Sequence, residues 1–188
     1  MNLIRGRLDK HNFRRKVVSE VHMFRPFADW LADTPLSKTL QDHSWVVPTS
    51  QSIHILAVSI VFGSACMVNL RLLGVGRSGR SISQLSNTVV PWMWRGLAVL
   101  LFTGLVQTVA EPVRQFVTPM FWAKMLMIIL VAAITAVYAS AVRRHAALWD
   151  AASSRPWPAA IFAVVSTLLW LAIIVCGRFI GYTWSFYA

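Results

Sequence analysis

Four long apolar runs alternate with shorter polar segments along this chain. The runs cover approximately residues 53–73, 89–110, 120–142 and 157–180. Each is close to the roughly 20 residues that an α-helix needs to cross the hydrocarbon core of a bilayer. Because backbone N–H and C=O groups in lipid must be hydrogen-bonded within their own segment, these runs indicate helices rather than single strands. The pattern predicts an all-α fold, an integral membrane four-helix bundle.

The residues between the runs favour chain reversals. Gly74 and Gly76 follow the first run, Glu-Pro at 111–112 follows the second, and Arg-Pro at 155–156 precedes the fourth. Glycine and proline end helices for steric reasons, and short connections make neighbouring helices antiparallel. We therefore expect one domain of four transmembrane helices over residues 51–188.

An amphipathic pattern precedes the first run. Residues 33–35 (Asp-Thr-Pro) are typical of a helix N-cap followed by a proline in the first turn. Leu36, Leu40 and His43 then share one helical face. We expect residues 23–50 to be an amphipathic segment with a short N-terminal helix lying at the periplasmic interface of the membrane.

Composition supports the membrane interpretation. Of the 188 residues, 56% are hydrophobic and 13% are charged, against about 25% charged in a typical soluble domain. This excludes a disordered chain and argues against a water-soluble domain. The formal net charge of +11 would suggest nucleic-acid binding in a soluble protein. Here the apolar runs favour the lipid bilayer, and not nucleic acid, as the partner.

The basic residues gather at one end of the predicted helices. They are Arg71, Arg77, Arg80, Arg95, Arg143, Arg144 and Arg155. By the positive-inside rule, this end is cytoplasmic, and Arg71 and Arg95 lie at the cytoplasmic interface, where they set the topology. We therefore expect a multi-pass protein of a bacterial inner membrane with both termini on the periplasmic side.

The first 22 residues disagree with this orientation, because they are basic and yet precede the first span on the periplasmic side. They lack the apolar h-region of a signal peptide. Met23 offers an alternative start, after which the periplasmic segments carry few basic residues. We hypothesise that residues 1–22 are a basic extension that the native protein lacks.

Polar side chains lie inside the predicted spans or directly after them, at a shared depth near the periplasmic side. They come from all four helices and are His54, Gln107, Glu111, Lys124, Arg178 and Tyr182. A charge near the bilayer centre costs about 2.5–3.5 kcal/mol on insertion scales. We expect an inward-facing cluster with His54, Lys124 and Arg178 as hydrogen-bond donors and Glu111 as their counter-ion. The alternative is that the lysine and the arginine extend outward to the headgroups.

A cluster rich in donors suits an anionic or carbonyl-bearing ligand. The candidates are a quinone head group, the propionates of haem b, a lipid phosphate and a carboxylate of a partner protein. Axial ligation of haem by two histidines would need a second imidazole at the depth of His54, and no other predicted span supplies one there. His43 and His54 are the candidates for a copper site, since imidazole suits copper.

Catalytic motifs are missing from the sequence: it contains no GxSxG, HExxH, P-loop or GxGxxG pattern. We therefore favour a membrane subunit without catalysis of its own, which binds lipid, a partner protein or a second copy of itself. The alternatives are a redox-associated subunit that binds quinone or haem, and a copper-handling protein or small-solute permease. The predicted cytoplasmic half offers no internal polar cluster, which counts against transport.

Five stretches carry a family resemblance: residues 29–37 (DWLADTPLS), 48–56 (PTSQSIHIL), 69–74 (NLRLLG), 121–124 (FWAK) and 177–182 (GRFIGY). In these, the chain from about residue 23 onward resembles an uncharacterised family of small four-helix bacterial inner-membrane proteins. That family has acidic residues where this chain has Gln51 and Asn69, which removes two carboxylates from the pattern. The lysine in the third helix is also distantly similar to the CopD-like copper-resistance membrane proteins.

Overall fold

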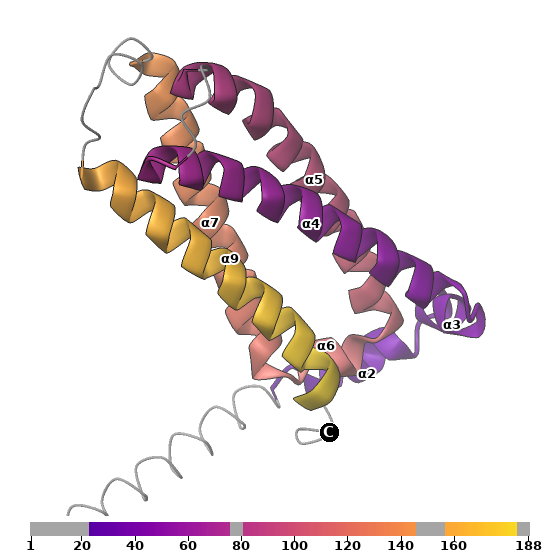
Figure 1. The fold of residues 1–188 in the computed structure, drawn as a ribbon. Coiled ribbons are helices and arrows are strands. Elements are labelled where there is room, and N and C mark those ends of the chain that lie inside the picture. Colours follow the sequence, from indigo (N-terminus) through magenta and orange to yellow (C-terminus); the bar gives the residue numbers. More distant parts are fainter. Residues whose placement is uncertain (1–22, 76–80, 146–156, 184–188) are drawn as a thin grey trace, which may run out of the picture.

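The structure is a computed structural model that describes residues 23–75, 81–145 and 157–183. Every regular element in these ranges is a helix (Figure 1). In chain order the helices are α2 (Arg25–Ala32), α3 (Pro35–Asp42), α4 (Val46–Leu73), α5 (Ile82–Ala110), α6 (Pro112–Phe116), α7 (Pro119–Arg144) and α9 (Trp157–Thr183). The predicted extension, residues 1–22, lies outside the described residues.

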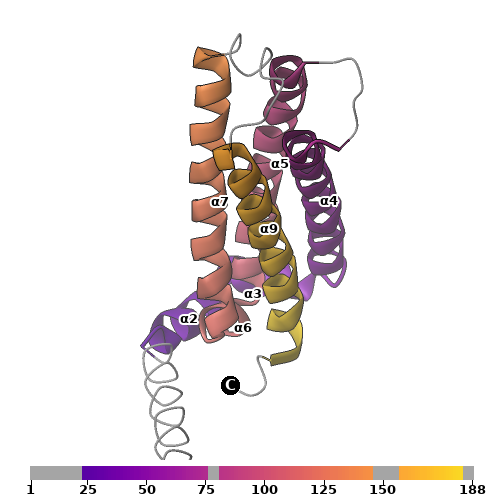
Figure 2. The same cartoon turned by 60° about the vertical axis from the view of Figure 1, so that its left-hand side comes forward.

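Four of these helices, α4, α5, α7 and α9, are long and apolar enough to cross a membrane. Each contains one of the apolar runs found in the sequence, so the predicted number and order of long helices is confirmed. Helix α4 packs against α5 and α9, and α9 packs against α7, whereas α5 and α7 contact each other little. The four helices lie side by side as an elongated bundle (Figures 1 and 2).

Helix α4 begins seven residues before the apolar run, at Val46. Pro48 does not prevent this, because the first turn of a helix needs no intrahelical N–H donors. The helix ends at Gly74, whose φ of 99° is the left-handed conformation that glycine adopts most easily. The amide of Val75 closes the end by donating to the carbonyl of Leu70 at 3.0 Å.

Helix α5 also begins about two turns before its apolar run. Ser81 and Gln84 form a capping box, in which each side chain bonds the backbone of the other residue. This cap starts the helix at Ile82, and Pro91 falls within it. As a consequence Arg95 lies 13 residues, or about 20 Å, from the start of α5. Arg95 is therefore near the mid-length of α5, and its place relative to the membrane surface stays a prediction.

The short helices α2, α3 and α6 lie at the end of the bundle where α4 begins and α5 ends (Figures 1 and 2). Helix α3 begins after Thr34, whose hydroxyl accepts from the amide of Ser37 at 3.3 Å. The structure does not support the predicted amphipathic face, because Ser37 is the buried residue, Leu36 is exposed and His43 lies beyond the end of the helix. The amide of the Gln41 side chain donates to the carbonyl of Ala110 at 2.9 Å, which ties α3 to the last residue of α5. Helix α2 packs against α6.

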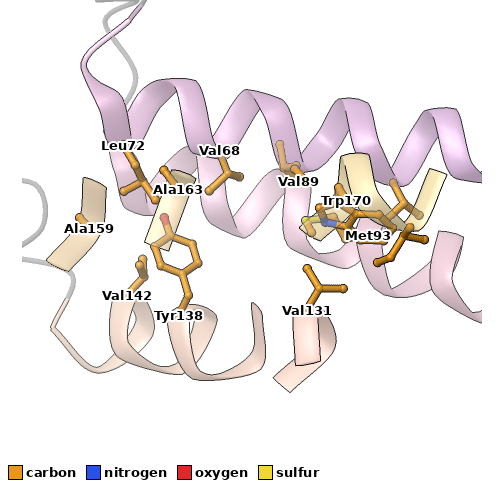
Figure 3. Close-up of a cluster of buried hydrophobic side chains, with 13 residues drawn as sticks. Val68, Leu72, Val89, Met93, Val131, Tyr138, Val142, Ala159, Ala163 and Trp170 are labelled. Carbon is orange, nitrogen blue, oxygen red and sulfur yellow. The ribbon is translucent and has the colours of Figure 1, made fainter. Parts of the chain in front are cut away.

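The centre of the bundle is packed hydrocarbon around Trp170, which is only 1% exposed (Figure 3). Val61 and Val131 are fully buried in the same cluster. Helices α4 and α5 pack tightly at Gly96, where an added Cβ would overlap the Val61 side chain. A residue without a side chain is needed there because the neighbouring helix occupies the space that the side chain would take.

Candidate functional site

His54 points from α4 toward α5. Its Nδ1 lies 2.7 Å from the hydroxyl of Thr103, and the carbonyl of the same threonine accepts from Ser50 at 3.3 Å. The Thr103 hydroxyl has one proton, which it donates to the carbonyl of Val99 at 2.8 Å. With that proton directed to Val99, the Thr103 oxygen can accept from Nδ1 of His54, and this tautomer leaves Nε2 for another partner.

Lys124 reaches from α7 to α9. Its ammonium would lie 3.7 Å from a Cβ placed on Gly177, so the side chain lies over the backbone of α9 where glycine leaves room. It is close enough to His54 and to Cys176 for electrostatic interaction with both. In the described part of the chain, neither of the two ion pairs, Lys38–Asp33 and Arg114–Glu111, includes Lys124. The structure thus places His54 and Lys124, both half-buried, within electrostatic range of each other on two helices that do not follow each other in the chain.

Gln107 lies one turn further along α5 from Thr103. Its side-chain nitrogen is buried and has no hydrogen-bond partner among the described residues. We name His54, Thr103, Gln107 and Lys124 the outer cluster. Its composition is unusual for the interior of a membrane bundle, because all four side chains carry a hydrogen-bond donor and none is a carboxylate.

The predicted role of Glu111 is wrong. Helix α5 ends at Ala110, so Glu111 has left the helix, with φ −134° and ψ 61°. The following residue, Pro112, disfavours the helical conformation for the residue before it. The Glu111 carboxylate instead pairs with Arg114 of α6 at 2.8 Å. Glu111 is therefore part of the turn between α5 and α7 and is not the counter-ion of the cluster.

Arg178 and Tyr182 also need correction. Arg178 is exposed, and its guanidinium donates to the Tyr182 hydroxyl at 2.7 Å and lies over the tyrosine ring. Gly177 faces Lys124, and the next residue on a helix is turned by about 100° away from it. Arg178 and Tyr182 therefore form a separate pair on the outer surface of α9 and do not enter the interior.

The two candidate copper ligands are apart. His43 follows α3, is exposed, and has its Nδ1 2.8 Å from the carbonyl of Thr39. His54 lies eight residues inside α4, or about 12 Å along the helix from its start. Within the described ranges, no group of three or more His, Cys, Asp and Glu side chains could hold a metal ion.

Sequence reasoning missed the small and hydroxylated residues that shape the outer cluster. Thr103 supplies the partner of His54, and Gly104 and Gly177 lie beside the imidazole and the ammonium. The sequence does contain a pattern that indicates these positions, since the apolar runs contain few other glycines and threonines at this depth. It was weak because such residues are common in membrane helices.

A second polar group, absent from our expectations, lies in the other half of the bundle. The Ser86 hydroxyl lies 3.1 Å from the Tyr138 hydroxyl and so links α5 to α7, while Asn69 donates to Thr167 at 3.0 Å and links α4 to α9. Between them is a cavity of about 10 Å³, roughly the space that one water molecule needs. We name the residues Asn69, Ser86, Tyr138 and Thr167 the inner layer. The prediction that this half lacks an internal polar cluster is wrong.

Four long apolar helices with polar side chains held between them indicate a multi-pass helical membrane protein. The particular family follows from the sequence: residues 30–183 match the model of a family of unknown function, DUF6644, and the chain belongs to that family. The expectation of an uncharacterised family is confirmed to this extent. Comparison with curated proteins and with solved structures finds no match.

Proposed function

We propose that this protein is a non-catalytic membrane subunit whose outer cluster binds the head group of a membrane amphiphile. The observation that carries the proposal is Lys124, a half-buried lysine among four helices with no acidic partner in the described residues. An amine in such a place is stabilised by a hydrogen-bond acceptor or an anion. A lipid phosphate supplies both and can reach this depth from the surrounding leaflet.

Two further features support an acceptor-bearing ligand. The buried nitrogen of Gln107 has a hydrogen to donate and no described partner, so a ligand oxygen at the cluster would satisfy it. His54 is held in place by Thr103 at 2.7 Å, which makes it a fixed wall of the cluster rather than a mobile side chain.

The test compares Lys124→Met with Arg178→Met. Both substitutions remove a positive charge at a similar depth, but only Lys124 belongs to the outer cluster. Native mass spectrometry of protein purified in mild detergent and supplied with phosphatidylglycerol measures bound lipid. We expect about tenfold less bound lipid for Lys124→Met and an unchanged amount for Arg178→Met. Equal lipid binding by the wild type and both variants would contradict the proposal.

A redox-associated subunit that binds quinone is the second candidate, and one observation favours it. When Nδ1–H of His54 donates a hydrogen bond to Thr103, Nε2 can accept a hydrogen bond and Lys124 can donate one beside it. The hydroxyl of a quinol needs an acceptor such as Nε2, and the carbonyl of a quinone needs a donor such as the ammonium. Organic extraction of the purified protein, an optical spectrum and metal analysis distinguish bound quinone, haem and copper from bound phospholipid.

The placement in the membrane is part of the same proposal. We place the cluster in the periplasmic leaflet of a bacterial inner membrane, with both termini periplasmic, because Arg71, Arg143 and Arg144 lie at the opposite end. Helices α2 and α3 would then lie at the periplasmic interface. Aromatic contacts at that end support this arrangement, with ring centroids 4.5 Å apart for Phe24 and Trp122 and 5.4 Å apart for Phe27 and Phe116.

A partner protein remains compatible with this assignment. A carboxylate from a partner could meet Lys124 in place of a lipid phosphate, and a second copy of the chain could pack on the bundle. The lipid measurement separates these, because a protein-bound cluster would carry no phospholipid.

A further inference from the structure

Arg95 occupies an unexpected place in the bundle. It lies 13 residues from the start of α5 and 15 from its end, which places it close to mid-length. Its neighbour Gly96 packs against Val61, which is 15 residues from the start of α4 and 12 from its end. Both helices therefore place Arg95 near the mid-length of the bundle, which lies within the hydrocarbon core in the proposed membrane placement.

The Arg95 side chain faces away from the bundle. The residue is exposed, and its guanidinium carbon lies 5.3 Å from the centre of the Trp92 ring, one turn away on the same helix. Neither ion pair of the described residues includes it. An exposed arginine at this depth would meet acyl chains alone, an environment that membrane helices avoid unless a partner neutralises the charge.

Exposed apolar side chains surround the arginine on the same side of α5. Trp92 is 55% exposed and Phe102 is 69% exposed, and the small residue Ala98 lies between them one turn beyond Arg95. Tryptophan and arginine are the residue types that carry most binding energy in interfaces, and a small residue lets a second helix approach closely. We name Trp92, Arg95, Ala98, Val99 and Phe102 the α5 face.

A second copy of this chain does not supply the missing charge. The seven acidic residues of the sequence are Asp9, Glu20, Asp29, Asp33, Asp42, Glu111 and Asp150. None of them falls within the four helices that are long and apolar enough to cross a membrane. A homodimer through the α5 face would bring two arginines together and leave both uncompensated.

We propose that the α5 face docks a transmembrane helix of a different protein, one that carries an aspartate or glutamate near the middle of its span. The carboxylate would pair with Arg95 in the low dielectric of the membrane, where such a pair is strong because water does not compete. The inference rests on the proposed membrane placement of the four helices and is independent of any ligand at the outer cluster.

A model peptide tests the docking directly. The probe is a 21-residue Leu-Ala transmembrane peptide with one central glutamate, labelled with an acceptor dye and reconstituted with donor-labelled protein in neutral phosphatidylcholine vesicles. We expect energy transfer to show at least tenfold tighter association with the wild type than with Arg95→Leu. Arg144→Leu, which removes a charge at the end of α7, is the matched control and should bind like the wild type.

Charge reversal distinguishes pairing from a general effect on folding. Arg95→Glu should bind the same peptide with a central lysine and lose the glutamate peptide, and a peptide with a central leucine should bind every variant equally weakly. Equal binding of the glutamate peptide to wild type and Arg95→Leu would overturn the proposal. So would loss of that binding in vesicles containing phosphatidylglycerol, since the net negative charge of this lipid would then neutralise Arg95 in place of the helix.

Discussion

The hydroxyl group of Thr103 performs two tasks at the residue scale. It donates within its own helix to Val99 and accepts from His54 on the neighbouring helix. A threonine hydroxyl in a membrane helix can satisfy its donor by bonding a backbone carbonyl one turn earlier in the same helix, and many threonines make no other hydrogen bond. The second contact makes Thr103 a link between α4 and α5 and fixes the tautomer of the histidine.

Removing that hydroxyl should weaken the link. Thr103→Val keeps the shape of the side chain and loses the hydrogen bond, so we expect the free energy of unfolding to fall by about 1 kcal/mol. SDS titration of the protein in detergent micelles measures it. Thr88→Val is the control, because the Thr88 hydroxyl bonds only the carbonyl of Gln84 in its own helix. Equal losses for both variants would show that the His54 contact contributes nothing.

The inner layer makes a similar prediction. Tyr138 is buried and bonds Ser86 across two helices, whereas Tyr182 is exposed and bonds Arg178 on its own helix. Tyr138→Phe should lower the free energy of unfolding by about 1 kcal/mol, since it leaves a buried hydroxyl of Ser86 without this partner. Tyr182→Phe should change it by less than about 0.5 kcal/mol. The same SDS titration compares the two, and a larger effect at Tyr182 would contradict this picture.

Helix packing at the element scale depends most on Gly96. An added methyl group there would overlap Val61, which is fully buried and short, so neither helix can give way easily. Gly63, on the exposed side of α4, has no neighbouring atom within 4 Å of an added Cβ. The two glycines therefore differ in what surrounds them, although both lie inside apolar runs.

We expect Gly96→Ala to lower the free energy of unfolding by about 1–3 kcal/mol. Gly63→Ala should be neutral or slightly stabilising, because alanine favours the helix. In the Gly96→Ala background, Val61→Ala should restore part of the loss by removing the methyl group that causes the overlap. SDS titration of the wild type, Gly96→Ala, Val61→Ala and the double variant gives the coupling energy, and strictly additive effects would show that the two side chains do not meet.

The elements could be predicted where they depend on the local sequence. The lengths of the apolar runs predicted the four long helices, and the N-cap pattern at residues 33–35 predicted where α3 begins. Features that depend on helix rotation or on an exact end could not be predicted. Arg178 faces outward because Gly177 is the residue turned toward Lys124, and Glu111 leaves the cluster because Pro112 ends α5 one residue before it. The partner of His54 lies 49 residues away along the chain, beyond any local pattern.

The whole molecule has two polar levels separated by a hydrocarbon centre. The outer cluster lies at one level and the inner layer lies at the other. Between them Trp170 belongs to one buried cluster with Val61 and Val131, in which Figure 3 labels Trp170 and Val131. From His54 to the Val61 level is seven residues of α4, or about 10 Å. The packed centre separates the two polar levels, and this is one reason why we propose a binding protein and not a permease.

The orientation of the molecule is a separate prediction at this scale. With Arg143 and Arg144 cytoplasmic, an alkaline phosphatase fused to the C-terminus should be active and a green fluorescent protein at the same position should not fluoresce. The same reporters inserted in the segment 76–80 should give the reverse result. A fluorescent C-terminal fusion would place the outer cluster in the cytoplasmic leaflet instead.

Cross-linking tests the central claim, that His54 and Lys124 meet inside the bundle and Arg178 does not, most directly. In a background with Cys66 and Cys176 replaced by alanine, cysteine pairs are introduced as His54→Cys with Lys124→Cys, and as His54→Cys with Arg178→Cys. A short bifunctional thiol reagent is added to membranes, and intramolecular cross-links are read by mass spectrometry. The account predicts efficient cross-linking of the first pair and little of the second. Efficient cross-linking of the second pair alone would contradict it.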